Sequence, residues 1–417
     1  MQKAEDTIPL DHLITLIIRN YVPGPQLSLP RHSSTDVQSP ARICGAWVEA
    51  LPDLIGNRTD AALDAAVKAF AVSILAGGPM RSAPIPAGLE AYGLALQSLR
   101  TALRSNTLRC PEQLAAAIMC LLLAEIFLPT SLDARAAHLQ GFGELVRLSG
   151  PEFYASGVPH KLFVGARPSL IIMGIHSRKA SFLAAPEWIH VPFGKAAPSA
   201  MQQLMSEGAM IPSIFEIVDK AAGAPESAIP AAREAVHGFM ALLGRLRQWE
   251  ERFQPITRTS SMSWVKPAAG PYGKPWIWFR SITDANALTN LWAFKAICLT
   301  NVDMLTTSFP ELVLVDEFSR HGISKTSLMQ EAVHLATMIC QSVGYLMQDE
   351  MKLFGPTSVL FPLRTAHDTF REGGSRTTKE LSWFNEILVS IYGRDECIPL
   401  FFTSFRNTLR GCERSQG

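Results

Sequence analysis

The chain has 417 residues, of which 47% are hydrophobic and 18% are charged, and its 38 basic and 37 acidic residues leave a formal net charge of +1. This balance argues against direct nucleic-acid binding, because proteins that bind DNA or RNA normally present a strongly basic face. The low charge content indicates a chain that buries much of itself or carries apolar clefts.

The N-terminal residues and the cysteines point to an intracellular protein. Met1 to Asp6 lacks the basic segment and apolar core of a signal peptide. The seven cysteines stand singly, without the spacing of a metal or redox motif, which is typical of a reducing compartment. They are Cys44, Cys110, Cys120, Cys298, Cys340, Cys397 and Cys412. We therefore expect a soluble protein without a disulfide framework.

Helical periodicity dominates the first part of the chain. A helix at about 8–20 precedes a proline- and serine-rich stretch, Pro23 to Pro40, which we expect to be a mobile loop. Further helices are predicted at about 40–54 and 60–76. Apolar residues then recur at steps of three and four, on one helical face. They are Leu89, Tyr92, Leu96, Leu99 and Leu103.

The longest apolar run extends from Leu114 to Ala124 and is interrupted by Glu125 before it continues to Leu128. Pro111 and Pro129 bracket it. This run is shorter than the roughly 20 apolar residues that cross a bilayer. We therefore predict a buried central helix and no membrane span.

The remainder of the chain also favours helices, because no long stretch alternates with period two. The predicted helices lie at about 133–148, 159–178, 199–221, 228–253, 283–308, 328–346 and 380–392. The stretch from Phe253 to Pro275 is a lid or a disordered link. The fold class is all-α, a single large irregular helical domain of roughly a dozen or more helices. Its divisions are an N-terminal helix and loop at 1–40, the helical domain at 41–405 and a tail at 406–417.

Catalytic and cofactor motifs are missing from the sequence. Gly141-Phe142-Gly143 has no third glycine at dinucleotide-binding spacing, and we expect close helix packing there instead. His176 and His190 bracket Glu187, but solvent contact or capping is the commoner role of such histidines. We therefore predict no metal and no cofactor.

Two aromatic segments are candidates for an apolar ligand pocket. Phe182 and Trp188 flank Pro186, and the segment forms either a structural corner or a pocket wall. Trp276 and Trp278 stand close to Arg280, and this group either anchors a loop or stacks a planar ligand. If the protein is an enzyme, the candidate catalytic residues are His176, Arg178 and Glu187. For Arg178 we favour the alternative role, an ion pair that fixes helices together, with Glu144, Glu152 or Glu187 as its partner.

Several of these segments together resemble the fungal-specific transcription factor domain, the middle-homology region of binuclear zinc-cluster regulators. The resemblance covers about residues 40 to 400. It begins with Trp47, Leu51, Leu54, Gly56 and Leu63 to Val67, and continues with Tyr92-Gly93, Ala95-Leu96, Leu99 and Ala102-Leu103. The next matching positions are His138, Gly141, Leu145, Arg147 and Gly150-Pro151, then Phe182-Leu183, Pro186 to Trp188 and Pro192. Ser342, Tyr345-Leu346, Phe361 to Arg364 and Ala366 complete it.

The resemblance implies an all-helical fold, a nuclear location and a role in controlling transcription of a metabolic gene cluster. It implies no catalytic residues. The chain departs from the family because the cysteine cluster and basic segment that bind DNA are not present before Cys44. Direct sequence-specific DNA binding is therefore not expected.

Three functions remain open. The first is a transcription-regulator-like protein that acts through protein partners or a small metabolite and is nuclear. The alternative is a cofactor-free cyclase, pericyclase or isomerase, or a ligand carrier, which reuses the regulatory fold for an apolar biosynthetic intermediate in the cytoplasm. The third is a decayed regulator that retains only its folded structure. The sequence does not indicate an oligomeric state.

Overall fold

The computed structural model of the chain consists of two compact units, and it describes most of the residues. Unit 1 comprises Met1–Pro23, Cys44–Leu170 and Ser390–Gly417, and unit 2 comprises Gly24–Ile43 and Ile171–Val389. The described residues are 8–24, 43–56, 60–77, 82–104, 111–131, 133–222, 228–253, 263–269, 275–314 and 325–392. Most of the loop predicted at 23–40 and the whole tail at 406–417 lie outside them.

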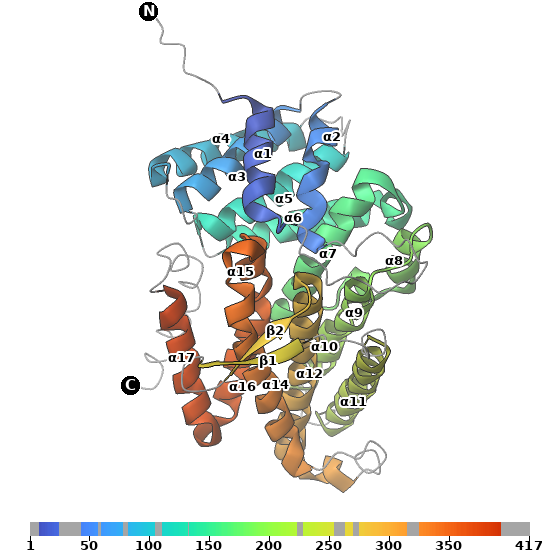
Figure 1. The fold of residues 1–417 in the computed structure, drawn as a ribbon. Coiled ribbons are helices and arrows are strands. Elements are labelled where there is room, and N and C mark those ends of the chain that lie inside the picture. Colours follow the sequence, from blue (N-terminus) through green and yellow to red (C-terminus); the bar gives the residue numbers. More distant parts are fainter. Residues whose placement is uncertain are drawn as a thin grey trace, which may run out of the picture. The chain divides into compact units, whose positions relative to one another are not determined.

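Unit 1 is built from the first helices of the chain, coloured blue to blue-green in Figure 1. They are α1 (Leu10–Tyr21), η1 (Cys44–Ala50), α2 (Leu51–Ile55), α3 (Ala61–Gly77), α4 (Ile85–Arg104), α5 (Pro111–Phe127), α6 (Ala134–Ser149), η2 (Pro151–Tyr154) and the first part of α7 (Gly157–Ser177).

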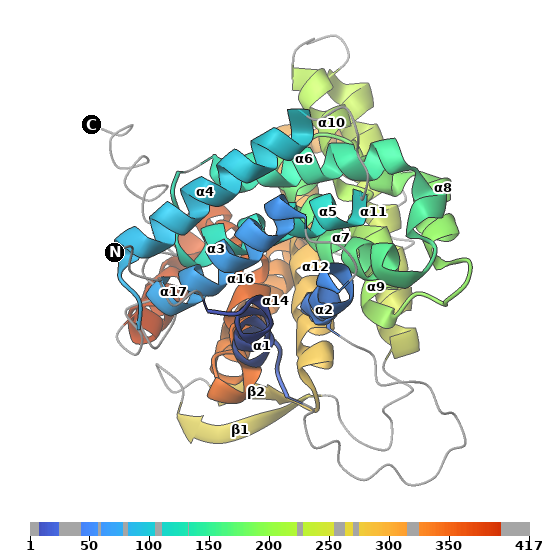
Figure 2. The same cartoon turned by 90° about the horizontal axis from the view of Figure 1, so that it is seen from above.

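Helices α3 and α5 form the centre of unit 1. Every residue of α5 from Gln113 to Phe127 is buried, which confirms the predicted central helix. α3 packs against α1, α4 and α5. At its C-terminal end, Gly77 lies so close to the carbonyl oxygen of Phe127 that a side chain at this position would collide with the α5 backbone. Figure 2 shows α4 and α6 on the near side of the same unit.

Unit 2 contains the later helices and one hairpin. Its elements are η3 (Phe182–Ala184), α8 (Pro186–His190), η4 (Val191–Phe193), α9 (Ala200–Gly208), α10 (Ile211–Ala222), α11 (Ala228–Phe253), β1 (Ser263–Ala269), β2 (Pro275–Phe279), α12 (Ile282–Ser308), η8 (Pro310–Leu314), α14 (Lys325–Leu346), η9 (Asp349–Met351), α15 (Phe354–Ser358), α16 (Leu360–Glu372), η10 (Gly374–Thr377) and α17 (Thr378–Tyr392).

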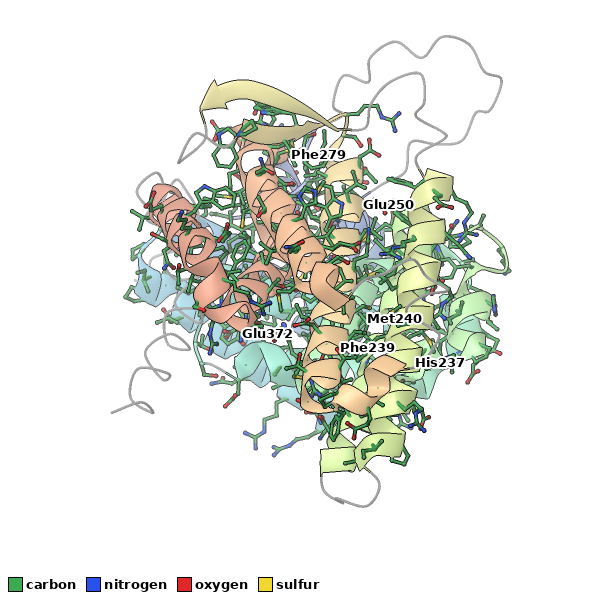
Figure 3. All side chains as sticks on the ribbon, turned by 90° about the horizontal axis from the view of Figure 1, so that it is seen from below. His237, Phe239, Met240, Glu250, Phe279 and Glu372 are labelled. Atoms are coloured by element: carbon green, nitrogen blue, oxygen red, sulfur yellow. The ribbon has the colours of Figure 1, made fainter. Side chains whose placement is uncertain are left out.

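The centre of unit 2 is α12, which is buried on nearly all sides and packs against α9, α11, α14 and α16. Its neighbour α11 is amphipathic. Phe239 and Met240 of α11 are buried, whereas His237 is exposed on the outer side of the helix, as Figure 3 shows. The predicted helices at 228–253 and 283–308 are therefore confirmed, with bounds within one residue.

The predicted all-α fold of a dozen or more helices is confirmed for the described residues. Among these residues, no helix combines the length and the apolar character that a membrane crossing requires. The described residues include four cysteines that are buried and not joined by disulfides, two in each unit. They are Cys44 and Cys120 in unit 1 and Cys298 and Cys340 in unit 2.

Of the two alternatives for Phe253 to Pro275, a lid or a disordered link, the disordered link is wrong for Ser263–Ala269, which form a strand. β1 pairs with β2 in an antiparallel hairpin, with Trp264 opposite Trp278 and Val265 opposite Ile277. Aromatic and β-branched residues favour such pairing. The strands are too short for an alternation of apolar and polar residues to be recognised in the sequence. In the structure this alternation is seen in β2, where Ile277 and Phe279 are buried on one face.

Two predicted helices are shorter or divided. The stretch 40–54 forms the 3-10 helix η1 and then α2, because Pro52 occupies the first turn of α2 and its ring opposes continuation of a helix through that point. The stretch 199–221 is divided into α9 and α10 at Ala209 and Met210. Pro212, which lacks a backbone N–H, lies in the first turn of α10, where that group has no helical acceptor.

Candidate functional site

The end of α7 holds Arg178, one of the predicted catalytic residues. Arg178 has a positive φ of 54° and ends the helix, with its N–H donating to the carbonyl of Ile175 at 3.3 Å. Its guanidinium Nε and Nη2 donate to the carboxylate of Asp219 on α10 at 2.7 to 3.0 Å. The guanidinium carbon also lies 4.1 Å from the ring centre of Phe215. Arg178 therefore ties α7 to α10.

Electrostatics agree with this structural role. The hydrogen bonds from Arg178 lower the pKa of the Asp219 carboxyl below its ordinary value. Two residues after Arg178, the N–H of Ala180 donates to Oε1 of Glu216 at 3.0 Å. Two acidic side chains of α10, Glu216 and Asp219, therefore bind the segment that follows α7. The predicted ion pair between helices is present, but the expected partners are wrong: Arg178 pairs with Asp219 and not with Glu144, Glu152 or Glu187.

The other two predicted catalytic residues lie in other surroundings. His176 is exposed on α7, with its ring centre 6.1 Å from that of Phe361 on α16. Glu187 is exposed in the first turn of α8, where a carboxylate interacts favourably with the positive end of the helix dipole. The structure therefore gives each of the three residues its own contacts: Asp219 and Phe215 for Arg178, Phe361 for His176 and the first turn of α8 for Glu187.

The segment around Pro186 forms a corner. The hydroxyl of Ser181 accepts the N–H of Leu183 at 3.3 Å, and Ala185 is extended before Pro186 starts α8. The rings of Phe182 and Trp188 close the corner at 4.8 Å with an interplanar angle of 68°. Trp188 is buried. Edge-to-face packing of this kind stabilises a corner by itself.

The aromatic residues of β2 pack on α14 and α12. A Cβ added at Gly344 of α14 would lie 2.7 Å from the ring of Trp276, so the indole rests against the α14 backbone. Phe279 lies 5.3 Å from Tyr345 and 6.2 Å from Trp292, and Trp278 lies 5.7 Å from Tyr345, all measured between ring centres. These contacts fit the predicted anchor.

Polar bonds fix both ends of β2. The side-chain amide of Gln341 donates to the carbonyl of Pro275 at 2.8 Å. After the strand, Nε of Arg280 donates to Asp284 in the first turn of α12 at 3.1 Å. The two aromatic groups therefore have different surroundings. Trp276, Trp278 and Arg280 contact α14 and α12, whereas Phe182 and Trp188 contact each other within the corner.

A polar cluster in unit 1 was not predicted. The hydroxyl of Tyr92 on α4 lies 2.6 Å from Nε2 of His138 on α6, and both residues are buried. The Glu125 carboxylate on α5, which is also buried, interacts with both groups. It also accepts the N–H of Thr130 at 2.9 Å and the Thr130 hydroxyl. Three helices therefore contribute one phenol, one imidazole and one carboxylate.

Burial sets the protonation of this cluster. It raises the pKa of the Tyr92 phenol, to which Glu125 contributes further, and it lowers the pKa of His138, although the negative Glu125 opposes that effect. The neutral phenol and neutral imidazole are thus the favoured forms. The signal in the sequence is Glu125 itself, the only charged residue between Leu114 and Leu128.

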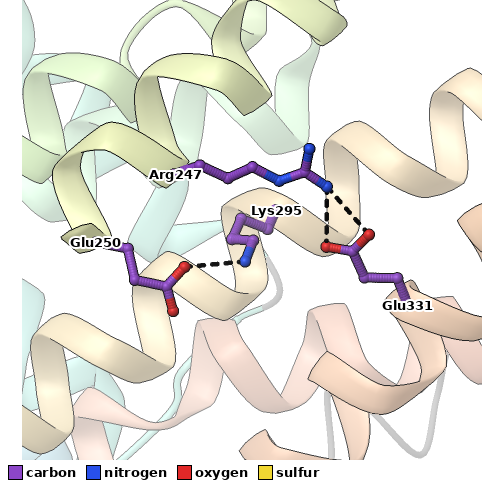
Figure 4. A network of polar contacts seen from close by, with 4 residues as sticks. All are labelled: Arg247, Glu250, Lys295 and Glu331. Atoms are coloured by element: carbon purple, nitrogen blue, oxygen red, sulfur yellow. Dashed lines mark hydrogen bonds and ion pairs between the residues drawn. The ribbon is translucent and has the colours of Figure 1, made fainter. Parts of the chain in front are cut away.

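A second polar network joins α11, α12 and α14 in unit 2 (Figure 4). Nζ of Lys295 donates to Glu250 at 3.1 Å, and Nη2 of Arg247 donates to both carboxylate oxygens of Glu331 at 3.2 Å. The Lys295 side chain is buried, so its charge depends on Glu250 for compensation. This network holds three helices in register.

The described part of the chain contains no group of three or more histidine, cysteine, aspartate or glutamate side chains that could hold a metal ion. The charged side chains of the described sites instead pair with one another, as Arg178 does with Asp219 and Lys295 with Glu250.

Comparisons with known proteins give little information on identity. No family model matches the chain, and no solved structure matches it. Over 143 residues the chain is 31% identical to the "Uncharacterized protein AN5342" of Emericella nidulans, a stretch that covers 34% of this chain and 30% of that protein. The chain therefore matches less than a third of the length of this fungal relative.

Proposed function

We propose that this protein is a regulator-like protein of a fungal metabolic gene cluster, which acts through protein partners, a small ligand or both. The main support is the position of the residues that carry the resemblance to the fungal transcription factor domain. Tyr92 and His138 match that pattern in separate segments, 46 residues apart, and they form one buried hydrogen bond.

Other matching residues support the same proposal. Gly150 has a φ of 77° at the end of α6, a conformation that favours glycine, and Pro151 begins the next turn. Leu145 is buried, and Phe182 and Trp188 close a corner. Because these residues maintain the fold, the resemblance concerns architecture, and the function then lies in what the helical surface binds.

The test is made in the fungal host with a tagged copy and a deletion. We expect the tagged protein in the nucleus and lower transcripts of neighbouring biosynthetic genes in the deletion strain. Re-introduction of the gene is the control and should restore those transcripts. A tagged protein that stays outside the nucleus, together with unchanged transcripts, would contradict the proposal.

The aromatic cluster of β2 favours a second function, the binding of an apolar biosynthetic intermediate. Trp276 and Trp278 are partly exposed, Trp278 lies beside Tyr345, and aromatic rings of this kind bind planar apolar molecules. A carrier needs only such a binding surface, whereas a cyclase or isomerase also needs catalytic groups, and one candidate, Arg178, is engaged by Asp219. The purified protein is mixed with an apolar extract of the host and analysed by mass spectrometry. We expect the wild type to retain a low-molecular-weight compound that the Trp278→Ala variant does not retain.

A further inference from the structure

Helix α4 carries a row of large aliphatic side chains that face the solvent. Leu89, Leu96 and Leu103 are 43%, 38% and 56% exposed, and Ile85, one turn before them, is 49% exposed. The three leucines recur every seven residues, the spacing at which helical positions return to nearly the same side. α4 therefore has an apolar stripe about 18 residues long outside the core of unit 1.

The stripe lies beside the face of α4 that packs against the rest of unit 1. Tyr92 and Leu99, which continue the spacing of three and four, are buried against the rest of unit 1. The sequence places these residues and the three leucines on one face, and the structure divides that face into a buried half and an exposed half. Between Leu89 and Leu96, Gly93 leaves open space, since no atom lies within 4 Å of an added Cβ.

The charges on the exposed side of α4 are segregated along the helix. Glu90 lies in its first half, and Arg100 and Arg104 lie in its last turns. All three are exposed, and within the described part of the chain none of them forms an ion pair. The exposed side is therefore acidic toward one end and basic toward the other.

We propose that two copies of this chain associate through α4, with the two helices antiparallel and Leu96 on the two-fold axis. In this arrangement Leu89 of each copy faces the partner's Leu103, so the whole stripe is self-complementary, as a two-fold interface requires. Glu90 lies level with residue 102 of the other copy, between the partner's Arg100 and the partner's Arg104. This one arrangement pairs the charged side chains and buries the exposed leucines.

A parallel arrangement does not satisfy them. It places Arg100 beside the partner's Arg100 and leaves Glu90 beside the partner's Glu90, and like charges at such positions oppose association. It also aligns the two helix dipoles in the same direction, which is unfavourable. The charge pattern thus selects the antiparallel orientation, and it selects a second copy of the chain over an arbitrary apolar helix.

The association is tested by sedimentation velocity on the full chain over a range of concentrations. We expect a reversible dimer, and Leu96→Glu should raise its dissociation constant roughly tenfold or more, because two carboxylates then face each other at the axis. Leu94→Glu is the matched control. Leu94 is 54% exposed on the same helix but lies about 160° around it from Leu96, and its substitution should leave the dissociation constant unchanged.

Charge substitutions test the orientation without touching the apolar stripe. Glu90→Arg should weaken the dimer, and the triple variant Glu90→Arg, Arg100→Glu and Arg104→Glu should restore it. A chain that stays monomeric at every concentration, or a dimer that Leu96→Glu leaves intact, overturns the proposal. Failure of the triple variant to restore the dimer overturns the antiparallel orientation. None of these outcomes depends on a role in transcription, so the proposed function is tested separately.

Discussion

At the scale of single residues, the Tyr92–His138 hydrogen bond shows how a buried polar pair is held in one protonation state. The phenol and the imidazole lie 2.6 Å apart with the Glu125 carboxylate beside them. A buried partner left without its hydrogen bond costs about 1–3 kcal/mol. The pair therefore makes the link between α4 and α6 sensitive to the charge of His138.

This sensitivity predicts a dependence of stability on pH. Burial lowers the pKa of His138 in the folded chain from the ordinary value of 6.5, so the folded state binds this proton less readily than the unfolded state. The contribution of His138 to the free energy of unfolding is therefore complete above about pH 6.5. It is lost progressively as the pH falls through the pKa of the folded state.

The prediction is tested by urea unfolding between pH 8 and pH 5, with the wild type compared with His138→Asn. The wild type should lose more stability than the variant over this range. His12→Asn, at an exposed histidine of the same unit, is the control and should follow the wild type. Parallel curves for the wild type and His138→Asn would refute the assignment.

The residue scale also marks what the sequence can predict of the sites. Arg178, Trp188, Trp276 and Trp278 were recognisable as residues with specific contacts, because arginine and tryptophan seldom stand near an aromatic or proline corner without a partner. Their partners were not recognisable. Asp219 lies 41 residues from Arg178, and only the fold brings them together.

At the scale of elements, the hairpin is fixed to α14 by the contact of Trp276 with Gly344. A methyl group at Gly344 would lie 2.7 Å from the indole of Trp276, a residue whose strand is paired with β1. Overpacking of this kind costs about 1–3 kcal/mol. Gly344→Ala should therefore lower the midpoint of urea unfolding and release β2.

The matched control is Gly244→Ala on α11, where an added Cβ meets no atom within 4 Å. Alanine favours a helix over glycine by roughly 0.5–1 kcal/mol, so this variant should be slightly more stable than the wild type. Both variants are compared by urea unfolding and by tryptophan fluorescence. A Gly344→Ala variant as stable as Gly244→Ala would contradict the close contact.

The polar network of α11, α12 and α14 gives a second prediction at this scale. Glu250→Gln removes the carboxylate that compensates Lys295, whose side chain is only 9% exposed. We expect a loss of about 1–3 kcal/mol, less than for a fully buried pair, because Glu250 is partly solvated. Urea unfolding of the variant measures this loss.

An exposed ion pair serves as the comparison. Arg147 and Glu144 lie one turn apart on α6, and both side chains are more than half exposed. Such pairs contribute little, so Arg147→Ala should change the free energy of unfolding by less than about 1 kcal/mol. If the two variants lose the same stability, Lys295 does not depend on Glu250.

The elements themselves differ in how far the sequence predicts them. Long helices such as α11 and α12 were predicted to within a residue, since each continues for about seven turns and no proline interrupts it after its first turn. The hairpin was missed because β2 has five residues. The division of α9 from α10 was also missed, although Pro212 is a local signal for it.

At the scale of the whole molecule, an all-α fold follows from the sequence, but the grouping of its helices does not. Helical periodicity is a local property, whereas the two units arise from contacts between segments far apart in the chain. The same limit applies to function. The exposed half of the α4 face became visible only when Tyr92 and Leu99 were found against the rest of unit 1.

Each unit contains two buried thiols, so the rate of cysteine alkylation reports the opening of unit 1 and of unit 2 separately. Burial raises the pKa of Cys120 and raises that of Cys298 to about 12, and only a thiolate reacts readily with an alkylating reagent. Modification of the folded chain should therefore wait for a local opening and be far slower than in urea. Peptide mass then separates Cys44 and Cys120 from Cys298 and Cys340, so one labelling time course measures how often unit 1 and unit 2 open. Equal rates in folded and unfolded chains would mean that these thiols are not enclosed.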